Sequence, residues 1–111
     1  MHVRLAVADD ASPLMAVASA SGLETSLAEF DALLADPAVT MYVAIDEPSG
    51  GPVGFLALRV HAPPDCVQAR RPLQLWRLYV RPDFHGHGVA RTLTGRALVH
   101  AHARNHDVLW L

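Results

Sequence analysis

The chain has 111 residues, of which 51% are hydrophobic, and it carries a formal net charge of −2 at pH 7. This length fits one domain, residues 1–111, with a core of its own and no room for a second. The small negative charge argues against binding to nucleic acid or to a membrane surface, because proteins of those classes usually carry a basic patch. The single cysteine, Cys66, excludes an internal disulfide, and no apolar run approaches the ~20 residues that span a bilayer, so we expect a cytoplasmic protein.

The first half of the chain predicts a strand, two helices and a hairpin. Asp10 and Ser12 offer N-caps for the first helix, and Gly22 ends it. Thr25 or Ser26 opens the second helix. Alternation and helical spacing give the bounds: a strand over residues 2–7, helices over 11–20 and 25–35, and strands over 39–45 and 52–60 joined by the turn 46–51.

The second half predicts a proline-rich loop, a central strand, a long helix and a last strand. The central strand is apolar on both faces, which is typical of a strand covered on both sides. Close packing is expected at Gly95, the glycine inside the long helix. The bounds are a loop over 61–72, a strand over 73–80, a helix over 87–104 and a strand over 107–111. The predicted fold class is α/β with a mixed sheet, in the order β-α-α-β-β-β-α-β, and its last two strands are parallel.

The stretch that carries chemistry is the corner between the central strand and the long helix, "RPDFHGHGVAR" at residues 81–91. A helix N-terminus presents unpaired backbone N–H groups and a partial positive charge. Gly86 and Gly88 remove side chains that would cover those groups, so an anion such as a pyrophosphate docks there. A tight turn without a ligand is the alternative. A metal pair at His85 and His87 lacks a third ligand in the sequence.

Together with the strand before it, this corner resembles the acyl-CoA-binding signature of the GNAT superfamily of N-acetyltransferases. The signature is Gln/Arg-x-x-Gly-x-Gly/Ala after a strand that ends in a Leu-Tyr-Val-like triplet and a proline, and this chain has "LYVRP" and then "HGHGVA". Gly88 and Ala90 stand at the two small-residue positions, and His85 replaces the usual Gln or Arg. The resemblance covers the whole chain. It implies the acyl-CoA N-acyltransferase fold, with a C-terminal helix and two strands missing after residue 111.

The resemblance implies acetyl-CoA as co-substrate, an amine of a small molecule or peptide as acceptor, and no metal. The backbone of Leu78, Tyr79 and Val80 would pair with the pantetheine arm as an added strand does. The pyrophosphate would be held by the backbone N–H groups of His85, Gly86, His87, Gly88, Val89, Ala90 and Arg91. The amine would attack the thioester directly, while a backbone N–H near Leu78 polarises the carbonyl group.

The catalytic side chains stay open at this point. Residues 66–82 contain no Asp or Glu, although the family often has a general base on or near this strand. The alternatives are His61, Asp65, Glu24, Glu29 or a chain of water molecules. The family's general acid is a tyrosine beyond the last strand, which neither Tyr42 nor Tyr79 matches, since both lie in predicted strands.

Further expectations concern single side chains and assembly. His100 and His102, two residues apart on a helix, are expected to face solvent. The apolar residues of 25–35 line either a substrate pocket or the core, and Arg77 meets a carboxylate of the substrate or of the core. The last strand exposes an edge that favours pairing with a second copy as a homodimer. Two function classes follow: an N-acetyltransferase, or a non-catalytic remnant that binds CoA at most.

Overall fold

The computed structural model describes residues 1–47, 50–65 and 68–111. Its centre is a sheet in the order β1-β2-β3-β4-β5, in which neighbours from β1 to β4 are antiparallel and β5 runs parallel to β4. The strands are β1 (His2–Leu5), β2 (Val39–Ile45), β3 (Pro52–Arg59), β4 (Pro72–Val80) and β5 (Val108–Trp110). The helices are α1 (Ala11–Ala20), α2 (Leu27–Ala35) and α3 (Val89–Ala103), with short 3-10 turns η1 (Ala8–Asp10) and η2 (Pro82–Phe84). Within this part of the chain, every helix is too short or too polar to cross a membrane.

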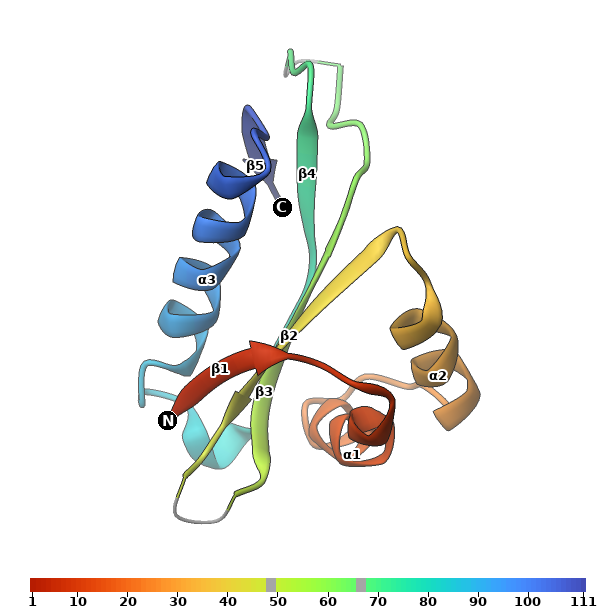
Figure 1. Cartoon of the computed structure of the whole chain (residues 1–111). Coiled ribbons are helices and arrows are strands. Elements are labelled where there is room, and N and C mark those ends of the chain that lie inside the picture. The colour runs from red at the N-terminus through yellow and green to blue at the C-terminus, as the bar shows by residue number, and fades with distance from the viewer. Residues whose placement is uncertain (48–49, 66–67) are drawn as a thin grey trace.

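The sheet separates two layers of helices (Figure 1). α3 covers one face, and α1 and α2 cover the other, so alternate residues of β2 and β3 pack in opposite directions. On the α3 face, Leu56 belongs to the same buried cluster as Leu93. On the opposite face, the ring of Phe55 meets that of Phe30 in α2, with centroids 5.5 Å apart. The predicted α/β fold with a mixed sheet is therefore confirmed.

The order of the elements is the predicted one, and the bounds differ by two residues at most. α2 begins after its N-cap, Ser26, whose hydroxyl accepts a hydrogen bond from the N–H of Glu29 at 3.2 Å. α3 begins at Val89 instead of residue 87, since Gly86 and Gly88 have φ angles of +81° and +78°, which a right-handed helix excludes. The glycine turn therefore lies outside the helix and ends at its first residue.

A β-bulge changes the direction of the side chains halfway along β4. The register of β4 against β3 shifts at Trp76, which is the extra residue. The bulge allows Leu75 and Leu78, three residues apart, to pack on the same α3 face. The expectation that both faces of this strand are covered holds only in part, because full burial is limited to Leu73 and Leu75. The second half of β4 is half-buried and accessible.

The glycine with close packing around it is Gly54 and not Gly95, where the sequence predicted it. A Cβ atom at Gly54 would lie 2.9 Å from the carbonyl oxygen of Tyr79 and 3.0 Å from Cγ1 of Val89. α3 thus meets β3 at a point where no side chain fits. Gly95 lies on the exposed side of α3, with nothing within 4 Å of an added Cβ, so the prediction for this residue is wrong.

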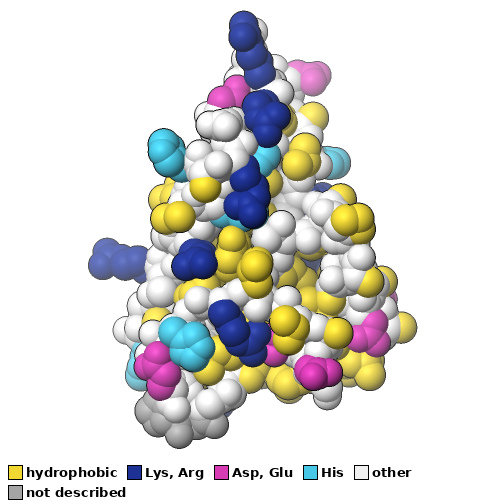
Figure 2. Space-filling view, in the orientation of Figure 1, with side chains coloured by type: hydrophobic (Ala, Val, Ile, Leu, Met, Phe, Trp, Pro, Cys, Tyr) yellow, Lys and Arg dark blue, Asp and Glu magenta, His cyan; other side chains and the backbone are white. Residues whose placement is uncertain are grey.

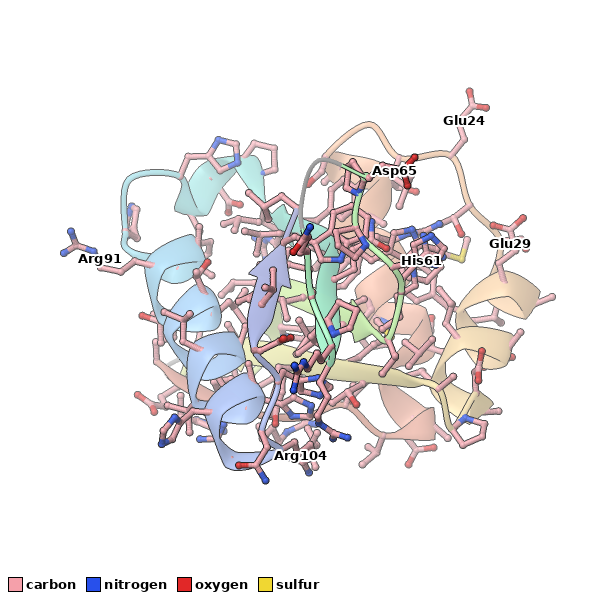
Figure 3. The ribbon with its side chains drawn as sticks, turned by 90° about the horizontal axis from the view of Figure 1, so that it is seen from above. Glu24, Glu29, His61, Asp65, Arg91 and Arg104 are labelled. Carbon is pink, nitrogen blue, oxygen red and sulfur yellow. The ribbon has the colours of Figure 1, made fainter. Side chains whose placement is uncertain are left out.

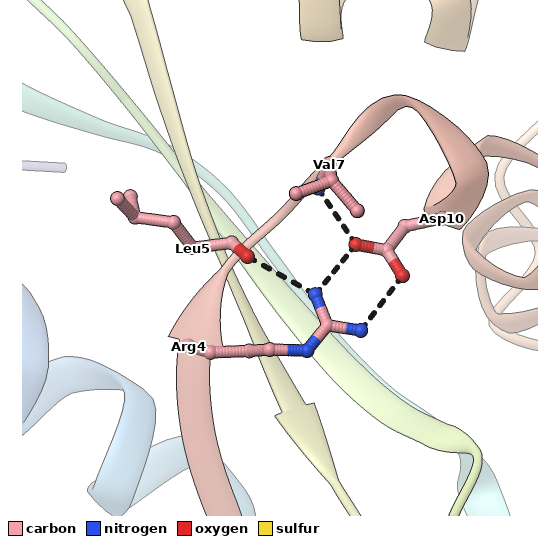
Figure 4. Close-up of polar contacts among 4 residues, drawn as sticks. All are labelled: Arg4, Leu5, Val7 and Asp10. Atoms are coloured by element: carbon pink, nitrogen blue, oxygen red, sulfur yellow. Dashed lines mark hydrogen bonds and ion pairs between the residues drawn. The ribbon is translucent and has the colours of Figure 1, made fainter.

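A buried carboxylate ties β1 to the start of α1 (Figure 4). Arg4 donates two hydrogen bonds to the carboxylate of Asp10, at 2.7 and 2.9 Å, and the N–H of Val7 donates a third at 2.7 Å. The hydrogen bond from Arg4 lowers the pKa of the Asp10 carboxyl below its ordinary value. This contact fixes the first strand against the layer that contains α1 and α2.

One prediction about α3 is wrong: His100 does not face solvent. Its ring is buried against the sheet, where Nδ1 lies 2.9 Å from the hydroxyl of Tyr42, and it stacks on the ring of His106. Burial lowers the pKa of His100, and the nearby Arg104 and His106 lower it further. Residue 100 falls on the buried stripe of the helix, whereas His102 is exposed as predicted.

Candidate functional site

The corner between β4 and α3 contains a pocket of about 380 Å³, here called the corner pocket. Its walls come from the end of β4, from η2, from the glycine turn and from the first turn of α3. The lining residues are Leu78, Val80, Phe84, His85, Gly86, Gly88, Val89, Ala90 and Arg91. Of the residues that the sequence predicted to bind a cofactor, all except Tyr79 and His87 line this pocket.

Backbone N–H groups are the main polar feature of the corner pocket. The first backbone hydrogen bond of α3 runs from the N–H of Thr92 to the carbonyl of Gly88, at 3.0 Å. An added Cβ at Gly86 or Gly88 would meet nothing within 4 Å, so the space in front of the turn is open. Three N–H groups at the start of the helix have no partner within it, those of Val89, Ala90 and Arg91. Such groups, together with the helix dipole, attract an anion.

The second half of β4 presents a backbone edge beside this pocket. β5 pairs with β4 only over residues 72–74 of β4. The N–H of Arg81 donates to the carbonyl of Val53 in β3 at 2.8 Å. Because ladder hydrogen bonds alternate along an antiparallel pair, the backbone groups of Leu78 and Val80 point away from β3, toward this edge. An extended ligand can therefore pair there as an added strand does.

The two predicted residues outside the pocket make other contacts. The backbone groups of Tyr79 point toward β3 by the same alternation, and its ring lies 5.5 Å from that of Phe55 on the α1 and α2 face. The ring of His87 lies 5.5 Å from that of Phe84. Phe84 lines the pocket and was missed by the sequence reasoning. An aromatic residue directly before the glycine turn is the signal that would have indicated it.

The His85 side chain connects the glycine turn to the end of β4. Its Nε2 lies 3.0 Å from the carbonyl oxygen of Val80, which also accepts a hydrogen bond from the hydroxyl of Ser21 at 3.1 Å. Since the carbonyl can only accept, Nε2 carries the proton in this contact. Both lone pairs of the Val80 oxygen are thereby used. The side chain of His85 therefore fixes the turn, and its ring N–H (at Nε2) points at the backbone carbonyl of Val80.

The acidic side chain next to this corner in the sequence is poorly suited to act as a base. Asp83 in η2 accepts hydrogen bonds from the guanidinium of Arg81 at 3.1 and 2.6 Å. These hydrogen bonds lower the pKa of the Asp83 carboxyl, so it stays ionised and paired. A general base for chemistry near neutral pH needs a pKa closer to the working pH.

The four candidate bases named from the sequence lie away from the corner pocket (Figure 3). Glu24 and Glu29 project from the α2 side of the molecule, whereas Arg91 projects from the opposite side at the start of α3. His61 and Asp65 belong to the loop that follows β3. None of the four lines the corner pocket.

A second pocket, of about 300 Å³, lies between α2 and β4 and is here called the arginine pocket. Its lining residues are Glu29, Ala32, Leu33, Asp36 and Arg77. Phe30 of residues 25–35 is buried in the core, as one of the two alternatives expects, and Leu33 lines this pocket, whose binding of a substrate stays a prediction. Among the described residues, no carboxylate oxygen lies within 4 Å of the Arg77 guanidinium.

Positive charge gathers in the second half of the chain, and of its arginines Arg91 lines the corner pocket. Residues 68–106 contain seven of the nine arginines and a single carboxylate, that of Asp83. Figure 2 shows arginine side chains spread down one face of the molecule, with hydrophobic side chains between them. In residues 1–47, 50–65 and 68–111, no three His, Cys, Asp or Glu side chains are grouped to hold a metal ion. The local charge suits an anionic ligand.

Comparison with known proteins gives one family and many similar folds. The sequence model of the acetyltransferase (GNAT) family matches residues 7–111. A search of curated proteins finds no match. Among solved structures, ribosomal-protein-alanine N-acetyltransferase from Brucella melitensis biovar Abortus superposes with a TM-score of 0.79 at 24% identity, over 99% of this chain and 77% of that one.

Two aminoglycoside acetyltransferases superpose equally well. The aminoglycoside 6′-N-acetyltransferase of Acinetobacter haemolyticus gives a TM-score of 0.84 at 18% identity, over 99% of this chain and 77% of that one. An aminoglycoside N-acetyltransferase solved in complex with CoA gives 0.79 at 16% identity, over 97% and 75% of the two chains. At these identities the superpositions establish the fold.

Proposed function

The chain belongs to the acetyltransferase (GNAT) family, and from this premise we propose that it is an N-acetyltransferase. It moves an acetyl group from acetyl-CoA to a primary amine of a small molecule or a peptide. The observation that carries the proposal is the corner pocket, where unpaired helix N–H groups and an open strand edge meet. A pyrophosphate needs the first feature and an extended pantetheine arm needs the second.

The residues of the corner fit the co-substrate, which supplies an acetyl group activated as a thioester. The N–H groups at the start of α3 would hold the pyrophosphate, and Gly86 and Gly88 leave room for it. Leu78 and the N–H of Val80 would pair with the amide groups of the pantetheine arm, since the Val80 carbonyl already accepts from Ser21 and His85. Arg91, which lines the corner pocket, favours the polyanionic end of CoA. We place the reaction in the cytoplasm, since a single cysteine suits a reducing compartment.

The proposed reaction is a direct transfer. The nitrogen of the neutral amine attacks the thioester carbonyl carbon, a C–N bond forms, the C–S bond breaks, and the sulfur leaves as a thiolate. The amine loses one proton to a base and the thiolate gains one, so no further reactant is needed. The backbone N–H of Leu78 at the open edge would stabilise the negative charge that develops on the carbonyl oxygen.

Titration calorimetry with acetyl-CoA tests the binding site by placing the same substitution at two glycines. Gly88 lies in the corner pocket, and Gly95 lies further along α3. Gly88→Glu should raise the dissociation constant at least about tenfold, roughly 1.4 kcal/mol, because the carboxylate fills the open space and repels the pyrophosphate. Gly95→Glu adds the same charge at an open, exposed position of α3 and should leave the constant within about twofold. Gly88→Ala separates backbone strain from charge. Equal affinity in the wild type and Gly88→Glu would remove the corner from the proposal.

A second candidate function is a protein that binds CoA without catalysing transfer. It is favoured by one observation, that three of the four candidate bases, His61, Asp65 and Glu24, line neither the corner pocket nor the arginine pocket. An acetyl-transfer assay between pH 6 and 9 separates the two. An enzyme should speed up as pH rises, because only the neutral amine attacks a thioester. CoA binding with no transfer at any pH supports the second candidate.

Homodimer formation through β5 stays a prediction, which light scattering checks.

A further inference from the structure

The arginine pocket lies where the reactive end of the co-substrate would arrive, an inference that rests on the proposed function. A ligand strand that starts at the N-terminus of α3 and pairs with Val80 and Leu78 reaches Arg77 next, at about 3.3 Å per residue. Arg77 stands directly after the bulge of β4, and its side chain lines the arginine pocket. The thioester and this pocket are therefore neighbours across β4.

From the charges of this pocket we infer that the acceptor is a free α-amino acid, an amine that also carries a carboxylate. The cation for the carboxylate is Arg77. Its guanidinium carbon lies 4.6 Å from the centroid of the Trp76 ring, so the side chain is held in place by stacking. It is half-buried, and the described residues bring no carboxylate within 4 Å of it. A planar guanidinium in this state matches a carboxylate with two hydrogen bonds.

A second guanidinium contacts the same indole, although its residue is not part of the pocket lining. The carbon of the Arg59 guanidinium lies 4.1 Å from the centroid of the same Trp76 ring. Its Nε donates to Oε1 of Gln74 at 2.7 Å, a neutral partner that leaves the positive charge unbalanced. Two arginines are thus held on one indole, and of the two only Arg77 lines the pocket. An acceptor without a carboxylate leaves the Arg77 charge in the pocket unmatched, which selects against simple amines and polyamines.

The negative side chains of the pocket are those of Glu29 in α2 and of Asp36, the C-cap of that helix. Glu29 accepts a hydrogen bond from the hydroxyl of Thr25 through Oε2, at 2.8 Å, and Asp36 accepts one from the N–H of Ala38 through Oδ1, at 2.9 Å. Each carboxylate keeps a second oxygen for a ligand. They receive the ammonium form of the amine as it enters and bring it to the thioester side. An amino acid carries one charge of each sign, as the lining of the pocket does.

The size and lining of the pocket fit a small acceptor with an apolar side chain. A volume of about 300 Å³ is at the lower end of small-molecule sites. Ala32 and Leu33 supply an apolar wall between the charged residues. We therefore choose L-leucine as the probe. Its partner in the test is L-leucinamide, which keeps the amine and side chain but lacks the carboxylate, as the N-terminus of a peptide does.

The experiment measures acetyl transfer to L-leucine, to L-leucinamide and to spermidine, and the binding of each by calorimetry in the presence of CoA. The expected result is at least about tenfold higher kcat/KM, or tighter binding, for leucine than for leucinamide or spermidine, neither of which offers a carboxylate to Arg77. Arg77→Gln should abolish the preference for leucine over leucinamide and leave CoA affinity unchanged. Arg77→Lys should restore part of it, since the charge returns without the planar fork.

The matched control is Arg104→Gln, which removes one positive charge at the far end of α3, away from Glu29 (Figure 3). It should keep the preference for leucine. Unfolding midpoints of all variants show whether the loss of stacking on Trp76 has weakened the fold. A preference for leucinamide or spermidine, or a leucine preference that survives in Arg77→Gln, overturns the inference. Because acceptor binding is measured as well as transfer, failure of the proposed function is seen separately, as absence of CoA binding or of transfer to every amine.

Discussion

The corner pocket and the arginine pocket lie on opposite faces of β4 and are built from different kinds of atoms. The corner pocket offers backbone N–H groups of one continuous stretch, from Leu78 to Arg91. The arginine pocket offers side chains from α2 and β4, which are far apart in the sequence. A backbone site keeps its chemistry when side chains change, provided that the glycines and the strand edge remain. A side-chain site changes its ligand with each substitution.

This difference explains how one fold serves many acceptors. The solved structures that superpose on this chain include enzymes named for aminoglycosides and for a ribosomal protein. Their fold is the same, so the choice of acceptor cannot reside in the backbone arrangement alone. In this chain the choice is expected to depend on charged side chains such as Glu29 and Arg77. Substitutions on the two faces should therefore have separable effects.

The largest effect is expected on the α3 face, from the same substitution at two glycines. Gly54→Ala should lower the free energy of unfolding by about 1–3 kcal/mol, because the methyl group meets the Tyr79 carbonyl and Val89 and forces α3 away from the sheet. CoA affinity should fall with it, while Arg77 keeps its place. Gly95→Ala, at an open helical position, should instead raise stability by about 0.5–1 kcal/mol. Denaturant unfolding measures both. A loss of stability at Gly95 equal to that at Gly54 would contradict this account of the packing.

A smaller effect is expected on the opposite face, from the ion pair that ties β1 to α1. Asp10→Asn should lower the free energy of unfolding by about 1 kcal/mol at pH 7, a value reduced because Arg4 is partly exposed. Asp9→Asn, next to it and exposed, is the control and should change stability by less than about 0.5 kcal/mol.

The pKa shift of Asp10 sets the pH dependence of the difference in unfolding free energy between the wild type and Asp10→Asn. Its pKa is lowered in the folded state, so its contribution is present above the ordinary carboxyl pKa of about 4 and is lost as pH falls through the folded value. The wild type and Asp10→Asn should therefore converge in acid. Unfolding curves between pH 7 and 2 check this, and a constant difference down to pH 2 would speak against a charged Asp10 as the cause.

The smallest effect belongs to His100 beneath α3. Burial lowers its pKa in the folded state, so the unfolded chain binds a proton first, and stability should fall as pH drops below about 6.5. Replacing it by Gln should flatten the loss between pH 7 and 5, whereas His102→Gln, on the exposed side, should leave the slope as it is. Thermal unfolding midpoints of the wild type and both variants between pH 7 and 5 measure these slopes. Identical slopes in the wild type and His100→Gln would assign the pH dependence to other groups.

Sequence reasoning succeeded where the relevant residues are neighbours in the chain. The glycine turn, the helix that follows it and the order of the elements depend on local signals such as positive φ, caps and alternation. It failed where distant residues meet. His100 bonds to Tyr42, 58 positions away, and Gly54 is small because Val89 approaches it. Neither contact leaves a periodic signal in the sequence.

The bulge at Trp76 is a second feature that the sequence pattern does not reveal. A strand pattern predicts alternation, and one extra residue redirects every later side chain. Arg77 was left open between a substrate carboxylate and a core carboxylate because its direction depends on that bulge. The structure places it over Trp76, with α2 across the pocket. The arginine pocket could therefore be recognised only in three dimensions.

The most direct test of the central claim is a titration of the nitrogen-15-labelled chain with CoA, followed by amide NMR. The corner binds through backbone N–H groups, so these groups report binding themselves. The account predicts the largest shift changes at Gly88, Val89, Ala90 and Arg91, with smaller ones at Leu78 and Val80 and little change in α2. Changes centred on the arginine pocket, or saturable CoA binding that leaves the amides of residues 88–91 unmoved, would contradict it.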